Sequence, residues 1–564
     1  MTKNDKKLEL TWYNKDKSLY YDPDKKEYLW VNKKDPRVSE PRILLEKAVF
    51  GDPNSENILI KGDNLLALKA LLSDYENTIK LIYIDPPFNT GTAFEFYDDG
   101  LEHSIWLTMM RDRLKLLNKL LSSEGSIFVH IDFNELSYLQ VLLDEIFGRK
   151  NFQSLIAWQR APEGRTVLGQ GQTPIVVSTE YVLVYAKNRE KLKMNYAKKV
   201  TNATEKVISQ YKLILDNVGK RKLLGEFSDV NGNIVKLYSH ESYKLSSIKS
   251  KDLLPSPLKF YLKNFDKIVQ SVGIQKESTF QQRLMSRLPK DKLCSVEFVP
   301  SRGKREGEFV TDYFLSKRKL LFLKDFSVPR RDGIYREVDM NNFWSHDEIG
   351  VTGTAGEGYA DFRRGKKPEA LIQRILEIGS EDGDWVLDSF AGSGTTGAVA
   401  HKMGRKWIMV ELENHAETHI IPRLKTVISG KDQSGISKEV SWNGGGGFKY
   451  FELGDSLFVR DRDLRLTVIN PKMYNGPLIR AVLKIEGFRL LNPDNALHGI
   501  SGKTVAHVTE QYLNQAYVDV LVNEVGAQAD YLVIYAKTIS NKLKLPESIE
   551  VRKIPDVLLR RFKA

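Results

Sequence analysis

Cysteine is almost absent from this sequence, since its 564 residues contain only Cys294. One cysteine cannot form a disulfide within the chain, and a cysteine-based zinc site needs several thiolates. Long apolar runs are also missing, because no stretch approaches the ~20 apolar residues of a membrane span. The first ten residues, MTKNDKKLEL, lack the apolar segment of a secretory signal. These absences predict a cytoplasmic protein with no bound metal and no membrane partner.

Acidic residues are fewer than basic ones. The chain has 73 Asp and Glu against 85 Lys and Arg, a net charge of +12. A basic balance suits a polyanion, because contacts with phosphates release condensed counterions. The 41% hydrophobic and 28% charged residues are ordinary for globular proteins, and the length allows roughly three or four domains. The composition therefore admits a nucleic acid as partner without requiring one.

Apolar strand-like segments alternate with amphipathic helical ones in two separate stretches, 51–189 and 341–435. In the first, IKLIYI (79–84) precedes a helix with one apolar stripe over 107–121, and SIFVHI (126–131) is the next strand. The same alternation returns in the second stretch. This order predicts an α/β fold, a parallel sheet covered by helices and built from two halves of the chain.

Four further regions interrupt or flank that fold. Residues 1–50 have no clear period and are interpreted as an N-terminal extension. Residues 190–340 are basic and irregular. They are interpreted as an insertion of about 150 residues, the size of a typical domain. The four glycines 444–447 predict a linker. Residues 450–564 predict a separate C-terminal α+β domain without a motif that reveals its role.

A glycine turn follows the strand Trp385–Asp388 and opens a helix. It reads Phe390-Ala391-Gly392-Ser393-Gly394-Thr395. Glycines let the backbone approach a ligand closely, and helix N-terminal amides can face its anionic groups. The next strand ends at Glu411, an acid placed to accept hydrogen bonds from ribose hydroxyls. The turn matches neither a dinucleotide fingerprint nor a P-loop, so it predicts a different cofactor.

A second motif, Asp85-Pro86-Pro87-Phe88, stands at the end of its apolar strand. The amino nitrogen of a nucleobase is a poor nucleophile, because its lone pair is delocalised into the ring. The Asp85 carboxylate and the Pro86 carbonyl could accept both N–H groups and localise that lone pair. Phe88 could stack on a base rotated out of its helix. The motif predicts chemistry on an exocyclic amino group.

The two motifs together resemble the amino-methyltransferase superfamily, whose catalytic motif reads Asp-Pro-Pro-Tyr or a variant and whose cofactor motif reads Phe-x-Gly-x-Gly. The catalytic motif comes first, which is the permuted order of the β group. KGDNLLALKALL, LIYIDPPFNTG, EYVLVYAKN and DSFAGSGTTGAVA are similar to the modification subunit of type III restriction–modification systems. The resemblance implies a Rossmann-like S-adenosylmethionine-dependent methyltransferase core interrupted by a target-recognition insertion.

That resemblance also implies roles for individual residues. The catalytic ones are Asp85, Pro86, Pro87 and Phe88, with Phe88 standing where Tyr is commoner. Asp63 matches the acid that contacts the adenine of the cofactor, and Lys367 matches a motif residue to which no contact is assigned. The residues expected at S-adenosyl-L-methionine are Asp63, Asp85, Asp388, Phe390, Ala391, Gly392, Ser393, Gly394, Thr395 and Glu411.

The expected reaction is direct methyl transfer to adenine N6 in double-stranded DNA, after base flipping. Target recognition falls to residues 190–340, where Arg302, Lys304, Arg305, Arg330 and Arg331 are candidate DNA contacts. Each of these could instead belong to a solvated basic face. The family further implies a homodimer and a separately encoded helicase–endonuclease subunit.

Two alternatives remain open. One is a methyltransferase of the same fold that acts on cytosine N4 or on RNA. The other is a catalytically silent DNA-recognition subunit that uses the cofactor to stabilise its fold. Cys294 lies outside both motifs, which argues against the cysteine-nucleophile route of cytosine carbon-5 methylation.

Overall fold

The computed structural model describes residues 9–22, 25, 27–39, 42–89, 102–162, 175–196, 198–229, 231–274, 279–301, 305–350, 354–359, 365–412, 414–455, 458–460, 467–469, 477–491, 496–525 and 530–554. The chain forms two compact units: Met1–Asn195 together with Asn341–Ala564, and Tyr196–Met340. Within the described ranges, no helix combines the length and the apolar character that crossing a membrane requires.

The first unit is built on a ten-stranded sheet with the order β20-β7-β8-β6-β5-β21-β22-β4-β23-β3. Its central strands β4, β22, β21, β5 and β6 are parallel, while β8 is antiparallel to both of its neighbours. The strands are β3 (Leu44–Gly51), β4 (Ile58–Lys61), β5 (Ile79–Ile84), β6 (Leu121–Ile131), β7 (Phe152–Gln159), β8 (Thr179–Ala186), β20 (Phe343–Trp344), β21 (Trp385–Asp388), β22 (Lys406–Glu411) and β23 (Gly447–Leu453).

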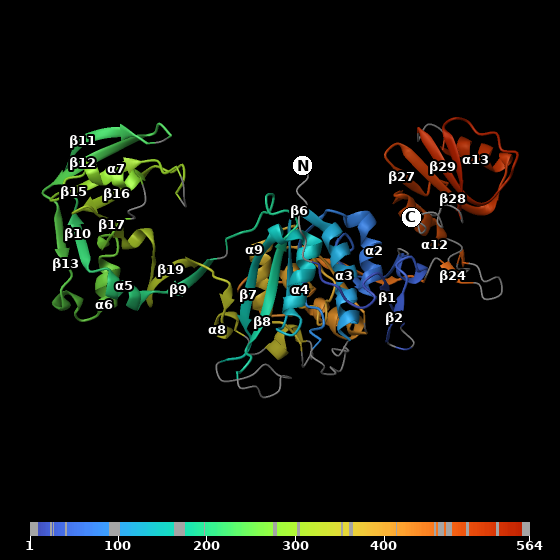
Figure 1. Cartoon of the computed structure of the whole chain (residues 1–564), viewed down its shortest axis with the longest axis horizontal. Helices are drawn as coiled ribbons and strands as arrows, with labels where there is room; N and C mark the ends of the chain where they lie inside the picture. The colour runs from blue at the N-terminus through green and yellow to red at the C-terminus, as the bar shows by residue number, and fades with distance from the viewer. Residues whose placement is uncertain are drawn as a thin grey trace. The chain divides into compact units, whose positions relative to one another are not determined.

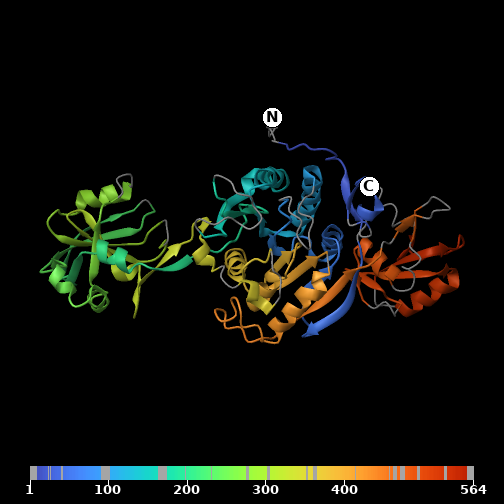
Figure 2. The ribbon, with the colours of Figure 1, turned by 90° about the horizontal axis from the view of Figure 1, so that it is seen from below.

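Helices cover both faces of this sheet, which explains why its central strands are apolar at almost every position. The helices α2 (Asn64–Tyr75), α3 (His103–Leu120) and α4 (Leu136–Leu143) share one core with the sheet. The helices α9 (Glu369–Gly379), α10 (Thr395–Lys402) and α11 (Ile421–Ile428) share the other. Figure 2 shows the blue and cyan helices on one side of the sheet and the yellow and orange ones on the other. The fold is therefore the predicted three-layer α/β arrangement.

The order of the sheet reverses between β21 and β5. From β21 the chain passes through α10 to β22 on one side, and from β5 it passes through α3 to β6 on the other. The two strands are parallel neighbours, with Val386 opposite Leu81 and Leu387 opposite Ile82. Open α/β sheets bind ligands outside the carboxyl ends of the strands at such a switch point. Both sequence motifs follow these two strands.

The linker predicted at glycines 444–447 is wrong. Gly447 begins β23, which pairs in parallel with β4 and antiparallel with β3. A Cβ atom on Gly447 would lie 2.5 Å from the Phe50 carbonyl oxygen, so only glycine permits this backbone approach. The last glycine of the run serves close packing inside the sheet, and composition alone cannot distinguish that use from a flexible linker.

The region interpreted as an N-terminal extension also contributes to the unit. The strands β1 (Ser18–Asp22) and β2 (Glu27–Val31) form an antiparallel hairpin, followed by the short helix α1 (Pro36–Ser39). Leu19, Val31 and Val38 are buried in the same core as α2 and α3. These few apolar anchors have no regular period, so the sequence gives little indication of their burial.

The second unit contains an eight-stranded sheet with the order β11-β12-β15-β16-β17-β14-β10-β13 and a three-stranded sheet, β18-β19-β9 (Figure 1). Strand β11 is exposed at most positions, so it lacks the buried alternation that would have revealed it in the sequence. The elements are β9 (Lys198–Asn202), α5 (Thr204–Gln210), β10 (Leu213–Asn217), β11 (Lys220–Ser228), β12 (Ile234–Glu241), β13 (Lys244–Ser247), α6 (Pro257–Lys263), β14 (Ile268–Val272), α7 (Thr279–Arg287), β15 (Leu293–Phe298), β16 (Val310–Leu315), β17 (Arg318–Phe322), β18 (Val328–Arg330) and β19 (Gly333–Asp339).

The C-terminal part of the first unit carries a five-stranded sheet with the order β26-β27-β28-β29-β30. Its strands β28, β29 and β30 run parallel, and two apolar clusters bury its residues against helices α12 and α13. The elements are β24 (Phe458–Arg460), β25 (Thr467–Ile469), α12 (Pro477–Glu486), β26 (Arg489–Leu490), β27 (Gly499–Ser501), β28 (Thr504–Leu513), α13 (Gln515–Val525), β29 (Tyr531–Ile539) and β30 (Ile549–Lys553).

Candidate active site at the carboxyl ends of the central strands

Four neighbouring parallel strands each carry an acidic residue at their carboxyl end. Asp63 follows β4, Glu411 ends β22, Asp388 ends β21 and Asp85 follows β5 directly. Parallel strands place their carboxyl ends at one edge of the sheet, so the fold brings these four predicted residues to the same edge. Carboxylates gathered at a switch point suit a ligand that carries positive charge.

Asp388 fixes the start of the glycine turn. Its Oδ1 accepts a hydrogen bond from the Phe390 N–H at 2.9 Å, and its Oδ2 accepts one from the Thr396 hydroxyl at 2.6 Å. Burial raises the pKa of Asp388 to about 7, and the nearby carboxylates of Asp85 and Glu411 add to the increase. Asp388 is therefore primarily a support for the turn, and its protonation is sensitive to charge at the site.

The turn itself is held open by glycines and by Glu411. The Gly392 N–H donates to Glu411 Oε2 at 2.7 Å, and the Leu412 N–H donates to Oε1 at 3.1 Å. Gly392 and Gly394 have φ values of +52° and +74°, in the left-handed region that favours glycine. A Cβ atom on Gly394 would lie 2.9 Å from Ile420 Cγ2. Backbone conformation and packing space both require glycine at position 394.

A buried ion network supports the other half of the turn. Arg423 donates from Nη1 to the Ser393 carbonyl at 3.2 Å and to Thr395 Oγ1 at 2.8 Å. Its Nη2 pairs with Glu369 Oε1 at 2.8 Å, and Lys402 pairs with the other oxygen of Glu369 at 2.8 Å. The side chains of Arg423, Glu369 and Lys402 are fully buried. The turn therefore rests on a rigid base that the sequence did not reveal.

Asp63 already has structural partners. Its Oδ1 caps helix α2 by accepting the Leu65 and Leu66 N–H groups at 2.9 and 3.3 Å, and its Oδ2 pairs with the buried Arg113 at 2.9 Å. Any contact between Asp63 and the cofactor must therefore share the carboxylate with the helix cap and with Arg113. The contact expected from the sequence stays a prediction.

The catalytic turn is fixed from two sides. Trp106 in α3 donates its indole N–H to the Pro87 carbonyl at 2.7 Å. Lys367, just before α9, places its Nζ 3.1 Å from Asp85 Oδ1 and 4.6 Å from the centre of the Phe88 ring. The Lys367 carbonyl accepts a hydrogen bond from the Thr395 hydroxyl at 3.3 Å. Lys367 thus contacts both predicted turns, although the sequence suggested no contact for it.

A buried polar cluster below Asp85 was also missed by sequence reasoning. Glu180 on β8 contacts His130 Nε2 at 2.9 Å, Lys367 Nζ at 3.3 Å and the Arg160 guanidinium. Burial alone would raise the pKa of Glu180, but Lys367 and Arg160 hold it well below its usual range. Burial, together with the Lys367 ammonium, lowers the pKa of His130, whose ring stacks on Phe88 at 5.8 Å.

A second cluster that sequence reasoning missed surrounds Glu135, just beyond β6. Its Oε1 contacts Asn89 Nδ2 at 2.7 Å and His103 Nδ1 at 2.9 Å. Asn89 directly follows Phe88, and His103 is the first residue of α3. Glu135 therefore links the end of the catalytic turn to the helix that follows it.

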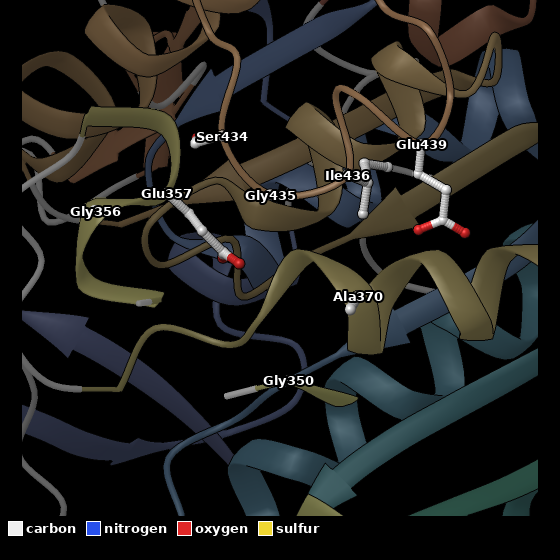
Figure 3. A pocket seen from close by; sticks show the side chains of 8 residues that line it. All are labelled: Gly350, Gly356, Glu357, Ala370, Ser434, Gly435, Ile436 and Glu439. Carbon is white, nitrogen blue, oxygen red and sulfur yellow. The ribbon is translucent and has the colours of Figure 1, made fainter. Parts of the chain in front are cut away.

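A separate cavity of about 450 Å³ lies beside α9, and none of its lining residues was predicted to belong to the site. Figure 3 shows Glu357 and Glu439 on opposite sides of it, with Ala370 of α9 below. Burial raises the pKa of Glu357, whose Oε2 accepts the Glu369 N–H at 3.1 Å. This acid supports the start of α9, and none of the four strand-end acids lines the cavity.

The predicted DNA contacts belong to the second unit. Arg305 pairs with Asp312 at 3.3 Å. Arg330 lies over the Tyr335 ring at 4.5 Å, and both Arg330 and its neighbour Arg331 are exposed. Arg302 and Lys304 lie outside the described residues. Contacts between these side chains and DNA remain predictions.

Cys294 lies in β15 of the second unit and is buried. Burial raises the pKa of its thiol to about 11, which leaves little thiolate at neutral pH. Its state therefore does not suit a nucleophilic role.

The chain is similar in sequence to the Mod subunits of type III restriction–modification enzymes. The HindVI Mod subunit of Haemophilus influenzae, a probable type III restriction–modification enzyme, is 36% identical over 413 residues, covering 71% of this chain and 54% of that protein. The EcoP15I Mod subunit of Escherichia coli, also type III, is 28% identical over 390 residues, covering 63% of this chain and 57% of that protein. The chain therefore spans about half the length of these curated relatives.

Among solved structures, a putative DNA modification methylase from Thermus thermophilus, complexed with S-adenosyl-L-methionine, is 16% identical with a TM-score of 0.30, covering 70% of this chain and 99% of that chain. The family model described as DNA methylase matches residues 79–421, which include both strand-end motifs and the residues between them. Because this match extends over more than half of the sequence, the chain belongs to the DNA methylase family.

Proposed function

We propose that this protein transfers a methyl group from S-adenosyl-L-methionine to adenine N6 in double-stranded DNA. The observation that carries the proposal is the position of Asp85 and of the glycine turn on neighbouring parallel strands at one switch point. A cofactor held by the turn and a base held at Asp85 would meet there.

The residues at this edge fit the cofactor. S-adenosyl-L-methionine supplies an electrophilic methyl group on a positively charged sulfonium. The Glu411 carboxylate lies beside the turn, and Gly392 and Gly394 have no Cβ atoms, so a ligand can approach the backbone of the turn closely. Glu411, whose oxygens already fix the turn, is the acid proposed to accept from ribose hydroxyls.

Asp85 would act on the target amino group. Its Oδ1 faces Lys367, which leaves Oδ2 to accept one N–H of the base, and the Pro86 carbonyl would accept the other. These two acceptors direct the nitrogen lone pair toward the methyl group and stabilise the positive charge that develops on the nitrogen. Phe88 provides the surface on which the extruded base stacks.

The remaining assignments extend the same proposal. Residues 51–189 and 341–435 would form the catalytic core, and 190–340 would recognise the target sequence. Residues 450–564 would mediate dimerisation or partner docking. The resemblance to type III Mod subunits favours a homodimer that associates with a separate helicase–endonuclease subunit, with methylation protecting DNA from that partner.

Methyl-transfer assays with Asp85→Ala and Asp85→Asn test the proposal. Wild-type protein should transfer tritiated methyl groups to DNA, and mass spectrometry of the nucleosides should find N6-methyladenine. Both variants should lose at least about 100-fold in rate while still binding the cofactor. Near-normal transfer by Asp85→Ala would refute the mechanism, N4-methylcytosine would reassign the target base, and an inactive wild-type protein would favour a silent recognition subunit.

A further inference from the structure

We propose that Lys367 is a positioning residue for the catalytic turn, held in place by Glu180. Its ammonium fixes the carboxylate of Asp85 with Oδ2 turned to the substrate and supports the Phe88 ring. This inference rests on the proposed function, because it concerns how Asp85 and Phe88 are presented to the target base.

The contacts of the Lys367 side chain carry the argument. Its Nζ lies 3.1 Å from Asp85 Oδ1, 3.3 Å from Glu180 Oε2 and 4.6 Å from the centre of the Phe88 ring. The side chain is only 7% exposed, so its ammonium has lost most of its water and depends on these partners. A desolvated cation between two carboxylates restricts the orientation of both.

Glu180 determines where that ammonium lies. Its carboxylate is almost fully buried, and its Oε2 contacts both His130 Nε2 and Lys367 Nζ. His130 stacks on Phe88 at an interplanar angle of 28°, and the Lys367 ammonium lies over the same ring. His130 and Lys367, which both contact Glu180 Oε2, therefore also contact one aromatic ring. Because Glu180 sits on β8, the position of Asp85 and Phe88 depends on a strand two places away in the sheet.

Charge balance gives Lys367 a second effect. Asp85 and Glu180 are two acids, and Lys367 and Arg160 are the two cations beside them. Without Lys367, Asp85 would lose this cation and Glu180 would keep Arg160, so the charge that holds the Asp85 carboxylate in place would be gone.

The backbone of Lys367 connects the same residue to the cofactor side. Its carbonyl accepts from the Thr395 hydroxyl, and that contact does not involve the side chain. Substitution of the side chain should therefore spare the glycine turn. A side-chain variant that loses activity but keeps its cofactor affinity therefore indicates a positioning role at Asp85, whereas a general structural role would lower the affinity as well.

The experiment compares full-length wild type with Lys367→Met and Lys367→Arg, and with Lys193→Met as the control. Lys193 is an exposed lysine whose ion-pair partner is Glu124, near the amino end of β6, whereas the strand-end carboxylates lie at the carboxyl ends of their strands. The substrate is DNA carrying the site that methylation mapping of the wild type identifies. Calorimetry gives the affinity for S-adenosyl-L-methionine, and initial-velocity assays give kcat and the KM for DNA.

Lys367→Met should lower kcat by about 100-fold, with cofactor affinity within about threefold of wild type. Lys367→Arg keeps a positive charge beside Asp85 and should restore part of the rate. Lys193→Met should match wild type. A kcat within threefold of wild type or a lost cofactor affinity in Lys367→Met overturns the proposal, as does a Lys367→Arg variant with no more activity than Lys367→Met.

Glu180→Gln supplies an independent test if Lys367→Met does not fold. Removing this negative charge leaves the Lys367 ammonium without its buried partner, so kcat should fall by at least about tenfold while cofactor affinity stays within about threefold of wild type. An unchanged kcat contradicts the proposal. Wild-type protein that transfers no methyl group would refute the proposed function itself, whereas active wild type with unaffected variants refutes only the role of Lys367.

Discussion

Replacing Gly394 with alanine should weaken cofactor binding by at least about tenfold. The residue has a φ of +74°, a conformation that costs a residue with a Cβ atom about 1–2 kcal/mol. The new Cβ would also lie 2.9 Å from Ile420 Cγ2, closer than such atoms normally approach. The free variant can relax the turn, so cofactor binding has to restore the strained conformation and its cost enters Kd. A loss of 1.4 kcal/mol is a tenfold change in Kd, so a backbone cost of about 1–2 kcal/mol corresponds to roughly five- to thirtyfold.

Gly383→Ala is the matched control. Gly383 has a φ of +79° at the opposite end of the same strand, and a Cβ there would meet nothing within 4 Å. Both variants should lose similar backbone stability, but only Gly394→Ala should lose affinity for S-adenosyl-L-methionine in calorimetry. Equal affinities in the two variants would refute the assignment of the turn to the cofactor.

Three further predictions concern the surroundings of the turn. Lys402→Met removes the buried cation beside Asp432 and leaves Glu369 with Arg423 alone, so urea unfolding should show a loss of about 3–5 kcal/mol, and a loss below about 1 kcal/mol would contradict the network. Asp388 has a folded-state pKa raised to about 7, so its contribution to the free energy of unfolding falls as pH rises from about 4 to 7. The free energy of unfolding of wild type relative to Asp388→Asn should therefore decrease between about pH 5 and 8. A constant difference would disprove the pKa shift. Phe88→Ala should lower kcat/KM for DNA by about 10- to 100-fold because base stacking is lost, whereas Phe88→Tyr should stay active. Equal rates for the two variants in initial-velocity assays would show that Phe88 does not act by stacking.

The sequence predicted the catalytic layer well, because its signals are local. A run of six residues, five of them apolar, stands before Asp85-Pro86 and predicts a buried parallel strand, and β5 ends at Ile84. The glycine turn between Asp388 and Thr395 lies at a strand-to-helix junction, as its pattern indicates. The two-part α/β core follows from the same local alternation.

The supports of the site could not be predicted, because they are tertiary. His130, Glu180 and Lys367 are far apart in sequence, and they meet only because β8 inserts antiparallel beside β6 and because the residues before α9 reach the same edge. No periodicity encodes that juxtaposition. The interpretation of the glycine run as a linker failed for a related reason. Whether a glycine gives flexibility or allows close packing depends on the neighbouring backbone, which the local sequence does not contain.

The position of the bound cofactor tests the central claim most directly. A crystal structure with S-adenosyl-L-methionine should place its sulfonium between the glycine turn at Gly392 and the carboxylate of Asp85, at the β21–β5 switch point. A cofactor found instead in the cavity lined by Glu357 and Glu439, or elsewhere on the molecule, would contradict the account.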